Sequence, residues 1–276
     1  MRRLPCPNTR AGVIVGLCAE SIRDRQLRER LRHALPHIET AELDYLARGP
    51  LADLYTIVGT DTVAGHVSTE EMKRVYKDTF VRSARTRDIY NEIKKAPEND
   101  ICPLCEQRTV STLDHYLPQS NHPSLTVVAA NLVPACSECN KIKLAMEAAA
   151  ANDQTLHPYF DEIDERRWLF ATVQEKRPAS VTFYADPPES PLQARIARHF
   201  EAFELAKLYA SHAAVEVNDL RFGLEKILRS GTSEDVRHHL QETAQSCAHA
   251  NPNSWRRAMY EALTGSEWFY SGGFIP

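Results

Sequence analysis

The stretch "CPLCEQRTVSTLDHYLPQSNHPSLTVVAANLVPACSECNKIK", residues 102–143, decides the fold of this chain. Two Cys-x-x-Cys pairs frame it, Cys102 with Cys105 and Cys136 with Cys139. A tetrahedral zinc ion takes four thiolates, and each such turn presents two sulfurs to one ion. We therefore predict one structural Zn²⁺ bound by all four cysteines. A redox role is disfavoured because two pairs occur and neither lies in a thioredoxin-like strand-then-helix context.

The interval between the pairs is long. Thirty residues, 106–135, separate the inner cysteines, which is more than a compact zinc ribbon contains. A folded element must fill it. Residues 111–116 predict a short strand with Asp114 and His115 near its end, where adjacent side chains point to opposite faces. Residues 126–134, "TVVAANLVP", predict a second strand.

A helix is predicted after the second strand. Asn131 lies near the end of that strand, and the helix begins at the second cysteine pair. It places Asn140 in its first turns, and its alanines suit a helix that stops near Asn152. The predicted order is strand, loop, strand, helix, with the zinc joining the start of the first strand to the start of the helix.

Asp114-His115, then Asn131, then Asn140, resembles the HNH endonuclease family, whose fold is the ββα-metal finger. The family pattern has a Cys-x-x-Cys, an Asp-His, an Asn-Leu before the second Cys-x-x-Cys, and a His or Asn after it. Here these elements read "CPLC", "LDHYLP", "NLVPACSEC" and "NKIK", over roughly 42 of the 276 residues. The departure is Asn140 where many members have His. An Asn there also occurs in the HNH domain of RNA-guided effector nucleases.

The resemblance implies a role for each of these residues. His115 is the expected general base, since an imidazole titrates near neutrality. Asp114 and Asn140 are the expected ligands of one catalytic divalent cation, Mg²⁺ or Mn²⁺; an amide oxygen suits Mg²⁺ better than a transition metal. Asn131 is expected to hydrogen-bond across the loop and orient His115. The zinc is expected to be structural, and the products to carry 5′-phosphate and 3′-hydroxyl ends.

Further residues are candidate contacts to the substrate. Lys141 and Lys143 follow Asn140 on the same helix and either contact the nucleic-acid backbone or face water. His122, in the loop, either meets a phosphate or is a solvated loop residue. His157, just after the finger, either approaches the metal or a phosphate, or is a hydrogen-bonded structural histidine ahead of a proline.

Charge and composition bound the class of protein. The net charge of −4 gives no global reason to expect nucleic-acid binding. Residues 72–95, however, carry eight basic residues against three acidic ones. This segment is either a solvated helix face or a surface for phosphates. No run of eighteen apolar residues occurs, so no membrane helix is expected, and the N-terminus is a poor signal peptide. We therefore expect a cytoplasmic protein.

The predicted fold class is α+β and mostly helical, with a zinc-stabilised ββα-metal finger between helical segments. We predict an N-terminal helical region over 1–97, the nuclease finger over 98–152, a β-hairpin connection over 153–189 and a C-terminal helical region over 190–276.

The C-terminal helices are predicted from apolar spacing. One helix is expected over 192–208 and a second over 217–228. A third is expected to be capped by Ser233, and the last to be closed by Gly265.

These observations favour a metal-dependent HNH endonuclease that hydrolyses nucleic-acid phosphodiester bonds, with DNA as the expected substrate. The resemblance also implies a setting in restriction or anti-phage defence, beside a sensor or ATPase partner, and a homo-oligomer would suit cutting of both strands. The alternative is a zinc finger that binds nucleic acid or a protein partner without cutting. That alternative predicts no need for Asp114 or His115.

Overall fold

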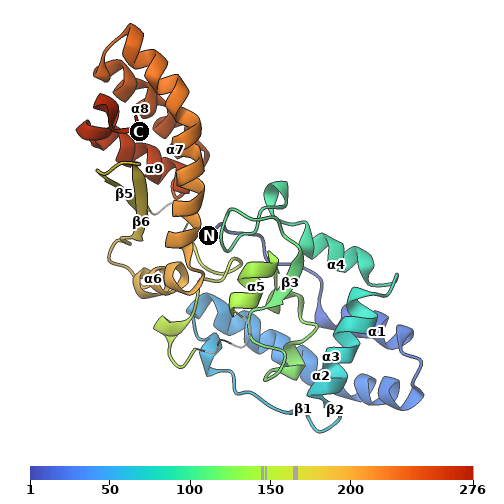
Figure 1. Cartoon of the computed structure of the whole chain (residues 1–276). Coiled ribbons are helices and arrows are strands. Elements are labelled where there is room, and N and C mark those ends of the chain that lie inside the picture. The colour runs from blue at the N-terminus through green and yellow to red at the C-terminus, as the bar shows by residue number, and fades with distance from the viewer. Residues whose placement is uncertain (144–145, 147, 164–166, 276) are drawn as a thin grey trace. The chain divides into compact units, whose positions relative to one another are not determined.

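The computed structural model describes the chain except for residues 144–145, 147, 164–166 and 276. It divides into two compact units, Met1–Asp161 and Glu162–Pro276 (Figure 1). The boundary falls within the predicted connection, residues 153–189. Both units combine helices with small two-stranded antiparallel sheets, which confirms the mostly helical α+β class.

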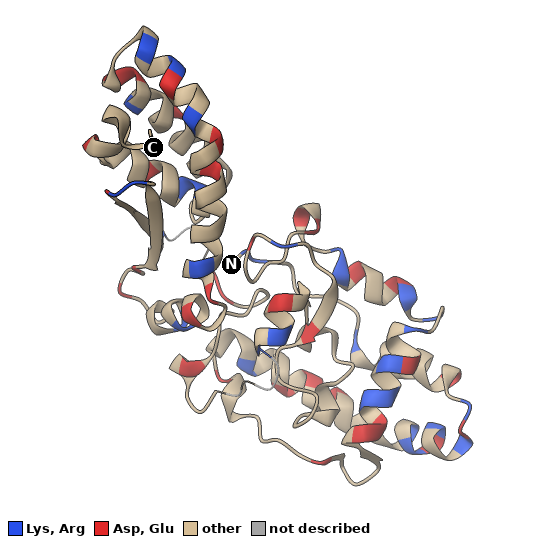
Figure 2. Ribbon diagram, in the orientation of Figure 1, with Lys and Arg blue, Asp and Glu red and all other residues tan. Residues whose placement is uncertain are grey.

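The first unit is built on helices that precede the cysteine segment. Its helices are α1 (Ala11–Ser21), α2 (Arg25–Arg48), α3 (Thr69–Arg74), α4 (Arg87–Lys94) and α5 (Ser137–Lys143), with a π-helix at Val75–Val81 after α3. Ser68 and Glu71 form a reciprocal capping box at the start of α3. Figure 2 shows basic and acidic residues interspersed along these helices.

Two small sheets belong to the same unit. They pair β1 (Thr62–Val63) with β2 (Val67–Ser68), and β3 (Thr112–His115) with β4 (Leu132–Ala135). In the second sheet Thr112 lies opposite Ala135 and His115 opposite Leu132.

The predicted second strand over 126–134 was too long. Only β4 is extended, and Ala129–Asn131 form a 3-10 turn before it. Asn131 therefore precedes the strand instead of lying near its end. The reason is local: an asparagine side chain that bonds to nearby backbone competes with a strand ladder.

The predicted helix through Asn152 was also too long. α5 ends at Lys143, and the described residues Met146 and Ala148 lie outside any helix. Ala151–Asp153 form a separate 3-10 turn. Alanine favours a helix only weakly, and tertiary contacts override it. Residues 144–145 and 147 of the predicted helix lie outside the described residues.

The second unit contains the predicted hairpin and the C-terminal helices. The hairpin joins β5 (Leu169–Gln174) to β6 (Ser180–Ala185), and the helices are α6 (Gln193–Ala202), α7 (Leu205–Ser230), α8 (Ser233–Ala250) and α9 (Trp255–Gly265). β6 packs on α7, β5 on α9, and α8 on α9. The hairpin thus belongs to the core of this unit.

Two helix boundaries differ from the prediction. The expected helix over 192–208 is broken at Glu204, whose φ of 50° is left-handed, and the chain then continues as the single long α7. The N-cap of α8 is Thr232, not Ser233, because Thr232 forms the capping box with Asp235. α9 does end at Gly265, but its C-cap is Ser266 in an extended conformation.

Short helical turns complete the chain. They are the 3-10 turns Gly49–Leu51, Leu54–Thr56, Glu98–Asp100 and Pro123–Leu125, and the π-turn Phe269–Gly273. Among the described residues, no helix is both long enough and apolar enough to cross a membrane.

Candidate functional site

The four cysteines of the two pairs form one buried cluster. The potential ligand atoms of Cys102, Cys105, Cys136 and Cys139 all lie within 4.8 Å of one another. The first pair lies in a turn closed by a hydrogen bond from the Cys102 N–H to the Arg108 carbonyl at 2.8 Å. The second pair lies where β4 passes into α5. Four thiolates at this spacing are the donor set of a structural zinc, so the cluster fits the predicted ion.

The surroundings of the cluster favour thiolates. Hydrogen bonding among the four sulfurs lowers the pKa of Cys105 and Cys136 and raises the pKa of Cys102 and Cys139, so two of the four thiols ionise readily even before an ion binds. The guanidinium of Arg108 interacts electrostatically with the sulfurs, and its Nη1 is buried without a hydrogen-bond partner. A zinc bound by four thiolates carries a net negative charge, so a nearby cation is favourable. Spacing alone did not identify Arg108, which only the fold brings to the sulfurs.

His115 lies at the end of β3 with its imidazole held in one orientation. Nε2 lies 2.9 Å from the carbonyl oxygen of Thr126. A carbonyl can only accept, so Nε2 carries the proton and the lone pair of the neutral ring is on Nδ1. No hydrogen bond within the described residues engages Nδ1. Burial lowers the pKa of His115 to about 4, so the ring is neutral near pH 7.

Tyr76 covers the imidazole of His115. The two rings meet edge to face with centroids 4.6 Å apart. Tyr76 comes from the π-helix Val75–Val81, and such helices often occur at functional sites. A helical pattern does not reveal a switch to π geometry, so this contact could not be predicted.

Asp114 is buried beside Lys143. The Asp114 carboxylate oxygen Oδ2 lies 3.2 Å from the Lys143 ammonium, and the two side chains are 5% and 4% exposed. The contact between Oδ2 and the ammonium is an ion pair whose angles do not meet those of a hydrogen bond, and among the described residues Oδ2 has no hydrogen-bond partner. Burial raises the pKa of Asp114, while Lys143 opposes that rise. This oxygen, on the residue predicted to bind the divalent cation, thus faces the Lys143 ammonium.

Lys143 does not contact the substrate as predicted. Its ammonium donates to the carbonyl oxygens of His115 and Tyr116, each at 2.7 Å. Together with the pairing to Asp114, these bonds use its donors inside the protein. The prediction that Lys143 either contacts nucleic acid or faces water is therefore corrected. Lys143 instead ties the end of β3 to α5, which lie side by side (Figure 1).

Asn131 closes the loop between β3 and β4. Its Oδ1 accepts from the Leu117 N–H at 2.8 Å, and its Nδ2 donates to the carbonyls of Leu117 and Leu125 at 3.0 and 3.2 Å. The side chain is fully buried. Thr126, which holds His115, follows directly after Leu125. Asn131 thus fixes the loop that carries the partner of the imidazole.

Asn140 lies on α5, one turn before Lys143. Residues three apart on a helix share a face, so Asn140 lies on the side of α5 that reaches Asp114 through Lys143. The Asn140 side chain is half-buried, and no hydrogen bond within the described residues engages it. Two oxygen donors, one carboxylate and one amide, fit a hard cation such as Mg²⁺ or Mn²⁺.

The other residues predicted to contact the substrate differ in how far they are buried. Lys141 is exposed on α5 and remains a candidate substrate contact. His122 is 6% exposed, which does not fit a solvated loop histidine. His157 is 1% exposed; its Nδ1 accepts from the Tyr159 N–H, so its Nε2 donates to Tyr45 Oη at 2.9 Å. The structural alternative for His157 therefore fits the geometry.

The basic segment 72–95 is partly neutralised. Ion pairs join Lys73 to Glu70, Arg82 to Asp78 and Arg85 to Glu20. Within the described part of the chain, no ion pair engages Lys77, Lys94 or Lys95. Lys77 directly follows Tyr76, which contacts His115, so one unpaired cation of this segment is adjacent in sequence to the residue covering the imidazole.

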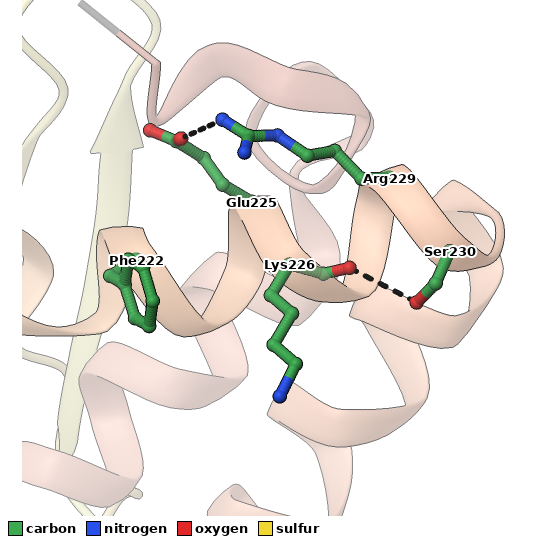
Figure 3. Close-up of a pocket in the computed structure, with 5 residues that line it drawn as sticks. All are labelled: Phe222, Glu225, Lys226, Arg229 and Ser230. Carbon is green, nitrogen blue, oxygen red and sulfur yellow. Dashed lines mark hydrogen bonds and ion pairs between the residues drawn. The ribbon is translucent and has the colours of Figure 1, made fainter.

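A shallow pocket in the second unit is separate from these residues. Five residues of α7 line it: Phe222, Glu225, Lys226, Arg229 and Ser230 (Figure 3). Arg229 pairs with Glu225 at 3.0 Å, and the Ser230 hydroxyl donates to the Lys226 carbonyl at 3.1 Å. The pocket contains no predicted site residue, so it is not part of the candidate site.

Comparison with known proteins shows one similarity over the whole chain. No family model matches the sequence, and no solved structure matches it. The chain is similar to protein ea31 of Escherichia phage lambda, with 24% identity over 295 residues. The alignment covers 99% of this chain and 100% of the phage protein, and so extends over both compact units.

Proposed function

We propose that this chain is a metal-dependent endonuclease of the HNH type that hydrolyses phosphodiester bonds in DNA. The observation that carries the proposal is the placement of His115. Its imidazole is neutral, its Nε2 is held by a backbone carbonyl, and a buried carboxylate that faces Lys143 precedes it in the same strand. A zinc finger that only binds nucleic acid has no need for this arrangement.

His115 acts as the general base in the proposed reaction. Its Nδ1 takes a proton from the water whose oxygen attacks the phosphorus, the bond from phosphorus to the 3′ oxygen breaks, and the leaving 3′ oxygen takes up a proton from solvent water. The hydrogen bond to Thr126 keeps Nε2 protonated and so leaves Nδ1 as the acceptor. The products carry a 5′-phosphate and a 3′-hydroxyl.

Asp114 and Asn140 hold the catalytic divalent cation. When bound, a Mg²⁺ or Mn²⁺ ion polarises the scissile phosphate and offsets charge on the leaving oxygen. Lys143 keeps the end of β3, which carries Asp114, against α5, which carries Asn140, and this supports a site shared by the two residues. The zinc of the cysteine cluster fixes the same strand and helix from the other end and takes no part in the chemistry.

The unpaired cations near the site supply substrate contacts. Lys77, Lys94, Lys95 and Lys141 are proposed to bind backbone phosphates, because phosphate contacts need only Lys or Arg on the facing side. These phosphate contacts do not depend on the base sequence of the substrate.

Plasmid cleavage tests the proposal. The purified protein is incubated with plasmid and Mg²⁺ or Mn²⁺, and His115→Asn is compared with His238→Asn, a surface histidine of α8. Loss of a general base typically costs 10²–10⁴-fold. We expect such a loss in His115→Asn with zinc content unchanged, and none in the control. Equal cleavage by both variants would refute the assigned base.

The alternative function gives a different result in the same assay. A protein that binds nucleic acid or a partner without cutting leaves the plasmid intact with every metal, while a mobility shift persists. A role in restriction or anti-phage defence with a sensor or ATPase partner rests on the family resemblance alone. Cleavage that appears only when a co-purified partner is added would support it.

A further inference from the structure

Three histidines gather in the first unit, outside the cysteine segment. His33 and His37 lie on α2, four residues apart, and His66 lies in the turn between β1 and β2. The ring centroid of His66 is 6.2 Å from that of His33 and 6.0 Å from that of His37. The proposed nuclease reaction uses none of them.

The spacing of the three rings suits a metal ion. Side chains at i and i+4 share one helix face, and a His-x-x-x-His pair on a helix can bind one ion. Zinc–nitrogen bonds of about 2.0 Å place the centroids of two bound imidazoles about 5 Å apart. The two separations from His66 are about 1 Å longer. His33 and His37 are exposed and His66 is half-buried, so their rings can turn toward a shared ion.

The backbone that carries His66 is held against α2. The His66 N–H donates to the Val63 carbonyl at 2.9 Å, within a turn anchored by the fully buried Val63 and Val67. Arg30 of α2 donates to the His66 carbonyl at 3.0 Å. The third imidazole is therefore already placed beside the other two, which lowers the entropic cost of binding.

The positive charge of Arg30 does not disfavour a metal ion bound by the three histidines. Its guanidinium makes two hydrogen bonds with the Glu71 carboxylate, at 2.8 and 2.6 Å. The pair is close to neutral as seen from the histidines. The ring nitrogens of the three histidines then remain as the available donors.

We propose that His33, His37 and His66 form a second metal site, for a transition metal such as Zn²⁺, with water at the fourth position. Imidazole donors favour Zn²⁺, Cu²⁺, Ni²⁺ and Co²⁺ over Mg²⁺, so this site differs in chemistry from the proposed catalytic one. Among the described residues, only the four cysteines bring three or more potential ligand atoms within 4.8 Å of one another. Binding at the histidines therefore draws the three rings together and ties the β1–β2 turn to α2.

Cobalt titration of the full-length, zinc-loaded protein tests the proposal. Co²⁺ bound by imidazoles gives visible d–d bands, whereas Co²⁺ that entered the cysteine cluster would add sulfur-to-cobalt charge transfer. We expect one Co²⁺ equivalent with d–d bands alone. His66→Ala should weaken its binding by about tenfold or more. His249→Ala, which changes an exposed histidine of α8, should leave it unchanged.

Two results would overturn the proposal. One is the absence of a Co²⁺ equivalent beyond the cysteine cluster in the wild type. The other is equal Co²⁺ affinity in His66→Ala and the wild type. His33→Gln, on the solvent side of α2, provides the same comparison if His66→Ala does not fold, and circular dichroism monitors folding in each variant.

Discussion

Replacing Lys143 with methionine removes the connection between β3 and α5. The ammonium has three partners: the Asp114 carboxylate at 3.2 Å and the carbonyls of His115 and Tyr116 at 2.7 Å. Hydrogen bonds to a charged group contribute about 1.5–3 kcal/mol each, and breaking a buried ion pair costs about 3–5 kcal/mol. The two carbonyl bonds together give about 3–6 kcal/mol and the ion pair about 3–5 kcal/mol, so we expect the free energy of unfolding to fall by at least about 3 kcal/mol.

Much of that loss comes from the charge left on Asp114. Lys143→Met leaves a carboxylate that is 4% exposed without its cation. In an Asp114→Asn background no such charge remains, so the same substitution should cost less, by about 1–3 kcal/mol. A double-mutant cycle over Asp114 and Lys143 therefore separates the ion pair from the two carbonyl bonds.

Urea denaturation followed by circular dichroism measures these free energies, with zinc content checked for each variant. Lys141→Met is the matched control, because Lys141 is exposed on the same helix and should change stability by no more than about 0.5 kcal/mol. A loss below about 1 kcal/mol in Lys143→Met, or additivity within about 0.5 kcal/mol in the cycle, would contradict the reasoning.

Three further predictions concern stability. Asn131→Ala removes the three bonds to Leu117 and Leu125 and should cost about 3 kcal/mol in urea denaturation; a cost under about 1 kcal/mol would show that the loop does not depend on it. Hydrogen bonding to Arg30 lowers the pKa of Glu71 to about 2, so its stabilisation is full above the unfolded pKa near 4.5 and is lost as pH falls toward 2. Because Arg30 is 41% exposed, the free energy of unfolding of the wild type should exceed that of Glu71→Gln by only about 1 kcal/mol at pH 6. This difference in stability should disappear toward pH 2, and a difference that stays constant with pH would contradict the assignment. Chelation of zinc should raise the rate of amide hydrogen exchange in β3 and β4 but not in β5 and β6, because the four clustered cysteines lie in the first unit. An unchanged exchange rate in β3 would show that the cluster does not hold the strand.

Local signals in the sequence predicted the features that short-range chemistry determines. The β5–β6 hairpin and the gathering of the four cysteines follow from residue type and spacing, and the structure confirms them. The zinc pattern even specified which distant segments meet, since two Cys-x-x-Cys turns at one ion leave few alternatives.

Tertiary contacts determined what the sequence could not show. From the sequence we expected Lys143 to be a surface residue, because His115 and Tyr116, whose carbonyls bind it, lie 28 and 27 positions away. Tyr76 and His115 come from different elements, and the sequence around neither residue indicates that the two rings are in contact. The end of α5 was misplaced for a related reason, since alanine-rich sequence favours a helix only where packing does not decide.

The two compact units follow one another in the sequence, so the chain passes from one to the other only once. Every residue assigned here to metal binding or hydrolysis precedes that passage. A gene fragment ending near codon 161 thus encodes the whole proposed catalytic apparatus. Exchange of the C-terminal part by recombination would therefore leave every residue of the proposed site in the chain.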